Sequence, residues 1–303
     1  MGPTGARTAP RWASAVLVLL VLVGPAAGAA AMPHASRRPA VVIHRVDEAH
    51  FSPAPGDPVF MLVVGSDMRP GQDAGRGDAL HLIGVNPTLG KATILNIPRD
   101  TWVPIPGHGR SKINDALALG GPPLQAQAVG ELVGVPVSFV LTTDFDGLIA
   151  MVDELGGVDV DVPIAMDDSF SGAKFVPGQT HMDGHQALAF TRNRHIPDGD
   201  LRRTEDQGLF ILAALAKLRA DSGPVATIHD LGVLFRHTRV DGVGVGDLYR
   251  MGRMALALDP GNVRSVTMPA TLGREGAASV VFPGGAAAGL FADFRDDAVL
   301  ESN

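Results

Sequence analysis

The chain has 303 residues, of which 46% are hydrophobic and 19% are charged, so it is long enough to bury one substantial core. Its net charge of −7 and isoelectric point near 5.8 exclude a general nucleic-acid binder, because contacts to a phosphate backbone require a basic face. Cysteine is absent, which excludes a disulfide framework, a zinc–thiolate site and a cysteine nucleophile.

The first predicted element is an apolar segment at residues 13–32, whose centre reads VLVLLVLV. Arg7 and Arg11 precede it, and positive charge before an apolar run keeps the N-terminus inside and sends the rest of the chain across the membrane. About 20 residues can just span a bilayer, yet Gly24-Pro25 interrupts the run and small residues suited to cleavage follow. We therefore expect a short cytoplasmic stretch at residues 1–12. Residues 13–32 then serve either as a single-pass cell-membrane anchor with an extracytoplasmic C-terminal domain, or as a signal peptide whose cleavage releases a secreted protein.

Residues 33–58 predict a linker, because Pro and Ser are frequent there, with one edge strand in the short run VVIHRV. The globular domain is expected over residues 59–269. Three apolar runs at residues 59–65, 79–85 and 91–97, bounded by Gly, Pro and Asn, predict buried strands. Helices are predicted at residues 111–120 and 122–134, the second with Pro near its start and Gly after its end.

Strands and helices continue to alternate downstream. A strand is predicted at residues 137–143, then a helix capped by Asp144 and closed by Gly156-Gly157, then a strand with one wet face at residues 158–163. Helices follow at residues 184–191, 201–219 and 247–258, and a last strand at residues 263–269. The tail, residues 270–303, carries no periodic pattern. This alternation predicts an α/β fold, a three-layer α/β/α sandwich around a mixed central sheet.

Arginines and carboxylates recur at the ends of the apolar strands. They stand in VVGSDMRP, GRGDALHLIGVN, LNIPRDTWVPIPG and, far downstream, FTRNRHIPDGDLRRTEDQ. Arg suits the multidentate recognition of phosphate, because its planar fork keeps its charge. Carboxylates beside such arginines repel phosphate unless a divalent cation bridges them. The mixture therefore indicates a metal–phosphate site, with a surface salt-bridge network as the alternative.

These motifs, in this order, resemble the LytR-CpsA-Psr family of cell-envelope phosphotransferases. The segments KINDALALGGP, FDGLIAMVDELGGVDVDVP and PGQTHMDGHQALAFTRNRH share in the resemblance, which runs from about residue 59 to residue 219 and more weakly to residue 269. It implies magnesium-dependent transfer of a glycopolymer from a polyprenyl-pyrophosphate carrier, at a membrane, to peptidoglycan as the acceptor. It also implies that helices wall a tunnel for the polyprenyl chain.

The resemblance assigns roles to individual residues. Two aspartates match the magnesium-associated carboxylates of the family: Asp67 and Asp78. Five arginines match its phosphate-binding, catalytic arginines: Arg76, Arg99, Arg192, Arg194 and Arg203. Gln207 matches a substrate-binding glutamine, and Asp200 matches a carboxylate that orients arginines. Arg203 and Gln207 stand four apart and share one face of a helix. Arg192 and Arg194 stand two apart and need an irregular or extended backbone to reach one phosphate.

One position departs from the family pattern, which commonly has an arginine directly before the site glutamine. This chain has Asp206 there. Because Asp206 follows Arg202 by four residues and Arg203 by three, we predict that it pairs with one of them, with Arg203 preferred.

Other conspicuous side chains have structural explanations. Asp100 is suited equally to capping a turn and to orienting Arg99. Asp167 and Asp168 are expected to be solvated in a loop. The histidines His181, His185 and His195 lack the spacing of a zinc site, although His195 adjoins the arginine pair.

The sequence leaves open one other enzymatic function and one non-enzymatic class of function. The same site with water as the acceptor would make the protein a polyprenyl-pyrophosphate pyrophosphatase. A non-catalytic polyprenyl-phosphate-binding envelope protein, or a transcriptional attenuator, is the other. The two aspartates disfavour an inert binder, and the lack of a basic face disfavours an attenuator that reads DNA.

Overall fold

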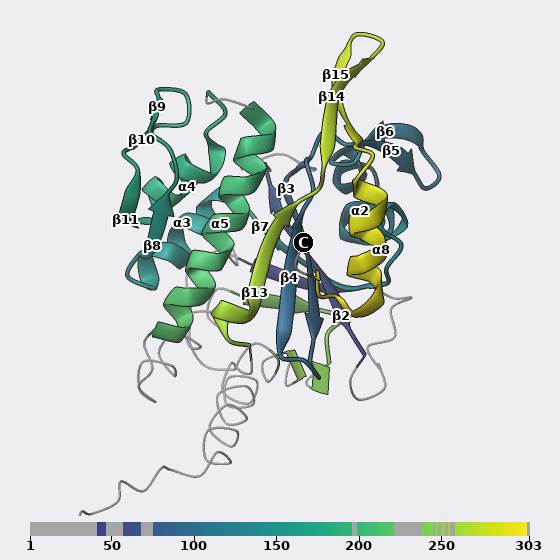
Figure 1. The fold of residues 1–303 in the computed structure, drawn as a ribbon, viewed down its shortest axis with the longest axis horizontal. Helices are drawn as coiled ribbons and strands as arrows, with labels where there is room; N and C mark the ends of the chain where they lie inside the picture. The colour runs from purple at the N-terminus through teal and green to yellow at the C-terminus, as the bar shows by residue number, and fades with distance from the viewer. Residues whose placement is uncertain are drawn as a thin grey trace, which may run out of the picture.

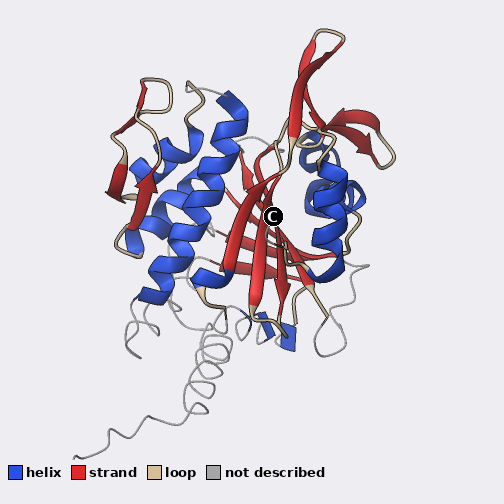
Figure 2. Ribbon diagram, in the orientation of Figure 1, coloured by secondary structure: helices blue, strands red, loops and turns tan. Residues whose placement is uncertain are grey.

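The computed structural model describes residues 41–46, 57–67, 75–195, 199–220, 238–244, 246–247, 250–251, 254 and 258–301. These residues form an α/β fold in which helices pack on both faces of a central sheet (Figures 1 and 2). The apolar segment predicted at residues 13–32 lies outside these ranges, as does most of the helix predicted at residues 247–258. Within the described ranges, no helix is both long and apolar enough to cross a membrane.

The central sheet has seven strands in the order β12-β1-β7-β2-β3-β4-β13. They are β1 (Val41–Arg45), β2 (Val59–Ser66), β3 (Gly77–Asn86), β4 (Lys91–Asn96), β7 (Val137–Thr143), β12 (Thr238–Asp241) and β13 (Val263–Thr267). Strand β2 pairs antiparallel with β3 and parallel with β7, so the sheet is mixed, as predicted. Strand β1 pairs with both β7 and β12. The VVIHRV run is therefore an interior strand rather than the predicted edge strand.

Two helices, α2 (Asp115–Val133) and α8 (Ala287–Asp297), lie on one side of the sheet, and α3 (Phe145–Glu154), α4 (Gly184–Arg192) and α5 (Gly199–Ala220) lie on the other (Figure 1). The α2–α8 face carries the main core, in which Leu62, Leu80 and Leu82 are fully buried. Side chains alternate between the two faces of β2, and those that point toward α2 and α8 are buried, whereas those on the other face are mostly only partly buried.

Local signals explain the neighbouring elements. Asp144 caps α3 by accepting a hydrogen bond of 2.8 Å from the Gly147 amide, as predicted. In β8 (Val158–Val162) the three valines are buried and Asp159 and Asp161 are exposed, which confirms one wet face. Strand β8 pairs with β11 (Gly178–Met182), and β9 (Met166–Asp168) pairs with β10 (Ala173–Phe175). A 3-10 turn, η1 (Pro260–Asn262), precedes β13.

The first predicted helix begins later than expected. A hairpin of β5 (Trp102–Ile105) and β6 (Gly109–Lys112) occupies its first residues, and α2 starts at Asp115. The helix is then interrupted at Gly120-Gly121, where Gly121 has φ +70°, directly before Pro122. The predicted division into two helices is therefore confirmed, and the start of the first was wrong because the hairpin pairs residues that look helical in isolation.

The C-terminal tail is ordered, although its sequence carries no periodic pattern. It forms a hairpin of β14 (Ala270–Glu275) and β15 (Ala278–Pro283), followed by α8. Phe294 of α8 is fully buried and packs edge-on against Phe60 of β2, with ring centroids 5.3 Å apart. Residues after 269 thus complete the main core, and only tertiary contact reveals this.

Candidate functional site

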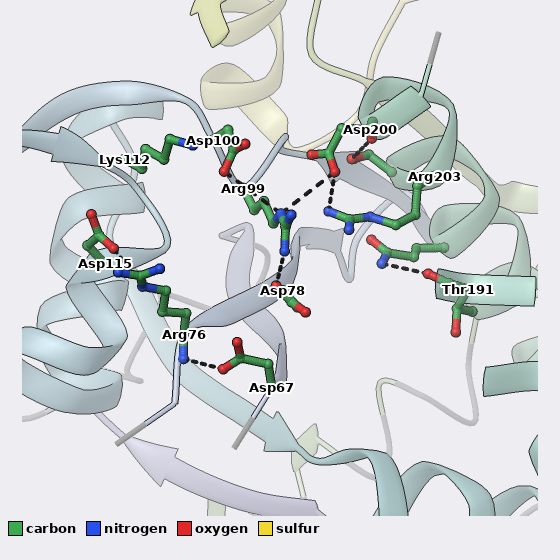
Figure 3. Close-up of polar contacts among 12 residues, drawn as sticks. Asp67, Arg76, Asp78, Arg99, Asp100, Lys112, Asp115, Thr191, Asp200 and Arg203 are labelled. Atoms are coloured by element: carbon green, nitrogen blue, oxygen red, sulfur yellow. Dashed lines mark hydrogen bonds and ion pairs between the residues drawn. The ribbon is translucent and has the colours of Figure 1, made fainter. Parts of the chain in front are cut away.

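Charged side chains gather where β2 and β4 end, where β3 begins and where α5 begins (Figure 3). Ser66 of β2 pairs with Gly77 of β3, so Asp67 and Asp78 each follow directly on that pair. Arg99 follows β4, and Asp200 and Arg203 stand in the first turn of α5. Strands adjacent in the sheet and the helix that crosses them thus assemble residues that are distant in the sequence.

Four of the predicted site residues form one chain of ion pairs. Arg99 Nη1 is paired with Asp78 Oδ1, and Arg99 Nε lies 3.7 Å from Asp200 Oδ1. The same oxygen of Asp200 lies 2.7 Å from Nη2 of Arg203. Arg203 is only 3% exposed, and an arginine is almost never buried so deeply unless it is paired. The structure therefore brings together Asp78, Arg99, Asp200 and Arg203, as the sequence predicted.

The two guanidinium groups remain charged at neutral pH, but for different reasons. Burial lowers the pKa of Arg99, yet Asp78, Asp200 and Asp100 outweigh it and raise the pKa above its ordinary value. Burial lowers the pKa of Arg203 to about 10, and the positive charges of Arg99 and Arg194 add to that decrease. The cations are thus close enough to repel one another, and an anion bound between them would relieve this repulsion.

Several donors of these arginines have no acceptor. Arg99 Nε, Arg203 Nε and Arg203 Nη2 are buried and make no hydrogen bond with the described residues. Nη2 is close to Asp200, but off the direction that a hydrogen bond requires. A buried donor without an acceptor costs about 1–3 kcal/mol. The site is therefore suited to receive oxygen atoms of an anionic ligand such as a phosphate.

Arg76 is held beside this cluster by two carboxylates. Its backbone amide donates to Asp67 Oδ1 at 2.6 Å, and its Nε lies 3.0 Å from Asp115 Oδ1. The other oxygen of Asp115 accepts a hydrogen bond from Ser111. Arg76 remains 64% exposed, so its guanidinium stands at the solvent side of the cluster.

Gln207 joins α5 to α4. Its Nε2 donates to the carbonyl of Thr191 at 3.0 Å, and the residue is buried. It lies one helical turn beyond Arg203, on the same face of α5, as predicted. One hydrogen of its amide group is thus used in positioning the helix, which leaves the other hydrogen and the oxygen for a ligand.

The two arginines at and just after the end of α4, Arg192 and Arg194, have different surroundings. Helix α4 ends at Arg192, and Asn193 is extended with ψ 128°, which is the irregular backbone that the pair requires. Arg194 acts electrostatically on Arg203 and so belongs to the cluster. The guanidinium of Arg192 instead stacks over the ring of Phe145, with its carbon 4.7 Å from the centroid. Arg192 is the one predicted arginine for which we find no link to the cluster among the described residues.

Asp206 pairs with an arginine, although not the preferred one. Its Oδ1 lies 3.2 Å from Nε of Arg202, and its side chain is fully buried. Arg203 is held by Asp200 instead. Burial raises the pKa of Asp206 to about 6, against the opposing charge of Arg202. The aspartate that departs from the family pattern thus pairs with Arg202, whereas Arg203 pairs with Asp200.

The predicted solvation of Asp168 is wrong, whereas Asp167 is exposed. Asp168 ends β9 with its side chain 3% exposed and lies 2.9 Å from Nδ1 of His195. It also accepts hydrogen bonds from the backbone amides of Phe170 and Ser171. Asp168 is buried because a turn between two strands wraps around its carboxylate.

Two polar residues of the site were not predicted from the sequence. Lys112 lies 3.1 Å from Asp100, whose other oxygen lies 3.8 Å from Arg99, and Asp115 holds Arg76. Asp100 therefore lies between two cations rather than capping a turn. Both missed residues stand in KINDALALGGP, a segment that takes part in the family resemblance, so its charged positions were the available signal.

Asp67 and Asp78 are the two carboxylates that the family resemblance assigns to magnesium. No group of three or more His, Asp or Glu side chains with the geometry of a metal site occurs in the described ranges. One oxygen of Asp67 is bound by the Arg76 amide, and one oxygen of Asp78 by Arg99. Mg²⁺ commonly takes one or two carboxylates and completes its shell with water and substrate phosphate. The donor set therefore fits Mg²⁺ together with a phosphate ligand.

Comparison with known proteins identifies the family. The profile of the LytR_cpsA_psr family matches residues 28–288. Over 163 residues the chain is 38% identical to the polyisoprenyl-teichoic acid–peptidoglycan teichoic acid transferase TagU of Bacillus mycoides, covering 53% of each protein. The chain thus matches about half the length of this curated relative.

Solved structures share the fold. The LytR-Csp2A-Psr enzyme from Actinomyces oris has a TM-score of 0.65 at 25% identity, covering 86% of this chain and 97% of that one. The LytR-CPS2A-psr family protein YwtF (TagT) with bound octaprenyl pyrophosphate lipid has a TM-score of 0.62 at 22% identity, covering 84% and 97%. Because the family profile matches most of its length, the chain belongs to the LytR-CpsA-Psr family.

Proposed function

We propose that this protein transfers a glycopolymer from a polyprenyl-pyrophosphate carrier to a hydroxyl group of peptidoglycan. The observation that carries the proposal is the pair Arg99 and Arg203, in which three buried nitrogens, Arg99 Nε, Arg203 Nε and Arg203 Nη2, make no hydrogen bond with the described residues. A pyrophosphate supplies acceptor oxygens and negative charge together. The relative TagU is named for a transfer of teichoic acid to peptidoglycan, and YwtF is described with a bound polyprenyl pyrophosphate. Both support this class of donor and acceptor.

The chemistry is a displacement at phosphorus. The acceptor oxygen forms a bond to the phosphorus that carries the glycopolymer, and the bond from that phosphorus to polyprenyl phosphate breaks. Negative charge spreads over the phosphoryl oxygens, so catalysis consists mainly of positioning and electrostatic stabilisation. Arg99 and Arg203 stabilise this charge from inside the site, and Arg76 and Arg194 do so from its exposed side. Asp200 keeps Arg99 and Arg203 facing one another.

Magnesium belongs to the proposal, with Asp67 and Asp78 as its protein ligands. A bound Mg²⁺ would neutralise pyrophosphate charge and allow these acids to lie beside it. The carboxylates can be tested without turnover. In the presence of a pyrophosphate analogue, Mg²⁺ titration by calorimetry should give a clear binding isotherm with the wild-type protein. Asp78→Asn should weaken the affinity about tenfold or more, by analogy with other changes around a metal ligand. Equal affinities would remove Asp78 as a ligand.

The lipid chain has a suitable surface in the middle of the sheet. On the face toward α5, Met61 of β2, Ile83 of β3 and Leu141 of β7 are only partly buried, although all three strands are interior. Apolar side chains at such positions are normally covered. We assign the polyprenyl chain to this face, with its pyrophosphate at the arginines.

Membrane attachment through residues 13–32 completes the proposal, since a lipid-linked donor lies in a membrane. Arg7 and Arg11 before an apolar run support an extracytoplasmic domain. Cell fractionation of the full chain tests this. Recovery in the membrane fraction after carbonate washing supports an anchor, whereas recovery of a shortened protein in the medium supports signal cleavage.

The central test of the proposed function is the loss of one guanidinium. Arg99→Ala should lower transfer of a lipid-linked glycan to peptidoglycan by about a hundredfold or more, by analogy with removal of a preorganised electrostatic donor. Arg274→Ala is the matched control, because Arg274 is exposed on β14 and donates to the carbonyl of Ala277, away from the cluster. Mass spectrometry of the products measures transfer. Unchanged transfer in a folded Arg99→Ala protein would contradict the role of Arg99, and release of glycan phosphate without acceptor would indicate hydrolysis instead.

A further inference from the structure

The turn between β9 and β10 holds a histidine at the edge of the arginine cluster. Asp168, at the end of β9, accepts hydrogen bonds from the amides of Phe170 at 2.9 Å and Ser171 at 3.3 Å, and its carbonyl accepts one from Gly172. Its Oδ1 also lies 2.9 Å from His195 Nδ1. A buried carboxylate in a tight turn is therefore aimed at one nitrogen of an imidazole.

His195 is fixed from three sides and is still open to solvent. Its ring stacks on Phe170, with centroids 4.9 Å apart and planes 23° apart, and its backbone amide donates to Asn193 Oδ1 at 3.1 Å. The side chain is nevertheless 56% exposed. A carboxylate at Nδ1 favours the tautomer with the proton on Nδ1, which leaves Nε2 with a lone pair that can accept a proton. The arrangement presents a positioned base.

The base stands next to an arginine of the cluster in the chain. His195 directly follows Arg194, whose charge acts on the buried Arg203. Figure 1 shows β9 and β10 beside α4 and α5, the helices that carry the arginines. An acceptor that comes from solvent must approach the pyrophosphate from an exposed side of the site, and His195 is an exposed side chain.

The carboxylates inside the cluster are already engaged by cations. Asp78 is paired with Arg99, Asp100 with Lys112 and Asp200 with Arg203. These ion pairs hold carboxylate oxygens against cations, where an acceptor hydroxyl would have to displace them. The His195 ring, in contrast, contacts the carboxylate of Asp168 from β9 and the ring of Phe170, and Arg194 precedes it in the chain.

We propose that His195 is the general base that takes the proton from the acceptor hydroxyl, and that Asp168 positions it. As the acceptor oxygen bonds to phosphorus, its proton passes to Nε2 of His195, and polyprenyl phosphate leaves with the electron pair of the broken bond. The imidazolium is stabilised by Asp168 and returns its proton to solvent after release. This inference rests on the proposed function and identifies a residue that the family resemblance does not assign.

The experiment separates proton transfer from donor binding. The His195→Gln variant should fold, because glutamine is similar to histidine in size and polarity and the side chain at this position is exposed. It should bind octaprenyl pyrophosphate with about the wild-type affinity, yet transfer glycan to peptidoglycan about a hundredfold more slowly. His185→Gln, at an exposed position on α4, is the matched control and should leave both values unchanged.

The pH profile supplies a readout that a structural role would not move. A general base must be unprotonated to act, so wild-type transfer should rise with pH as the base loses its proton, and His195→Gln should lose this rise. Added imidazole should restore part of the rate. Asp168→Asn should keep the rise while lowering the maximal rate, provided that its thermal melting confirms a folded protein.

The results can contradict the role of His195 separately from the proposed function of the protein. A His195→Gln protein that transfers at about the wild-type rate, or that keeps the wild-type pH profile, overturns the role of His195 and leaves the proposed function standing. A wild-type protein that neither binds octaprenyl pyrophosphate nor transfers glycan overturns the proposed function and this inference with it.

Discussion

Two buried titratable residues outside the arginine cluster make stability depend on pH in opposite directions. His81 on β3 is 2% exposed, and its Nδ1 lies 2.7 Å from Asn96 Oδ1. Since Asn96 donates to Ser265, its oxygen accepts from His81, which therefore carries a proton on Nδ1. Burial lowers the pKa of His81 to about 4, from 6.5. The fold thus favours the neutral form of His81 over the charged form.

The lowered pKa of His81 fixes the direction in which stability changes with pH. The unfolded chain binds the proton more readily than the folded chain, so the free energy of unfolding is fully present above pH 6.5 and falls as pH decreases toward 4. His81→Gln retains an N–H donor for Asn96 without the titration, so it should lose much of this decrease. Urea denaturation at about pH 7 and about pH 4.5, on either side of most of this titration, measures it. An equal loss of stability on acidification in both proteins would contradict the assignment.

Asp206 acts in the opposite sense. Burial raises the pKa of this carboxyl from 3.8 to about 6, so the folded chain holds the proton more tightly than the unfolded chain. The free energy of unfolding should therefore fall as pH rises from about 3.8 to 6, by up to about 3 kcal/mol. Asp206→Asn should remove this fall and leave the protein at least as stable as the wild type at neutral pH. The denaturation midpoint at acidic and at neutral pH decides, and a less stable Asn variant at neutral pH would show that the pair with Arg202 outweighs the burial cost.

The reverse change at this position restores the family pattern and should not help. Asp206→Arg places a second guanidinium four residues after Arg202 in a buried position, where two like charges repel. The first turns of α5 would shift, and with them Arg203. We expect lower transfer and a lower melting temperature, measured in the assay used for Arg99→Ala. Faster transfer with tighter donor binding would contradict the pairing as a structural feature.

At the scale of elements, the close approach of α5 to the sheet places Arg203 and Gln207. Gly208 allows this approach, because a Cβ there would lie 2.5 Å from Nδ2 of Asn96 and from Oγ of Ser265. Those two side chains hydrogen-bond to each other across β4 and β13. A helix with any other residue at this position must move away from the strands.

A pair of glycine substitutions separates this packing from helix propensity. Gly→Ala in an unobstructed helix stabilises by up to about 1 kcal/mol. A Cβ at Gly289 of α8 would have no described atom within 4 Å, so Gly289→Ala should raise the free energy of unfolding. Gly208→Ala should lower it, and should also reduce glycan transfer because α5 carries two site residues. Chemical denaturation measures the first effect, and two variants of the same sign would refute the packing argument.

At the scale of the whole molecule, the chain after residue 269 closes the main core. Phe294 is fully buried, and a Cβ at Gly84 would lie 2.8 and 2.9 Å from two atoms of its ring. The β14–β15 hairpin also supports the site, because the Val281 amide donates to the carbonyl of Asp100, next to Arg99. The tail is therefore part of the folded domain and not an appendage to it.

Removing the ring of Phe294 should be costly. Phe294→Ala should lower the free energy of unfolding by about 3–5 kcal/mol, the range for truncating a buried aromatic side chain. Leu272→Ala is the control, since Leu272 of β14 is 68% exposed and should change stability by less than about 0.5 kcal/mol. Thermal or urea denaturation compares them. Similar stabilities of both variants would contradict a structural role for the tail.

Features that depend on neighbouring residues could be predicted from the sequence. Apolar runs bounded by turn residues identified β2, β3, β4 and β7, and the Asp144 cap and Gly156-Gly157 bounded α3. The order of short motifs indicated the family and the residues of the arginine cluster. Such signals are readable because strand alternation, capping and turn chemistry act over a few residues.

Contacts between these residues depend on how the chain packs in three dimensions. The sequence could not show that Asp206 pairs with Arg202 while Asp200 takes Arg203, because both partners lie within reach on one helix and burial selects between them. Nor could it show that Asp168 leaves solvent to hold His195, or that Phe294 fills the core beside Phe60. Those contacts join segments distant in the chain, and their free energy comes from burial and charge compensation that exist only once the layers have packed.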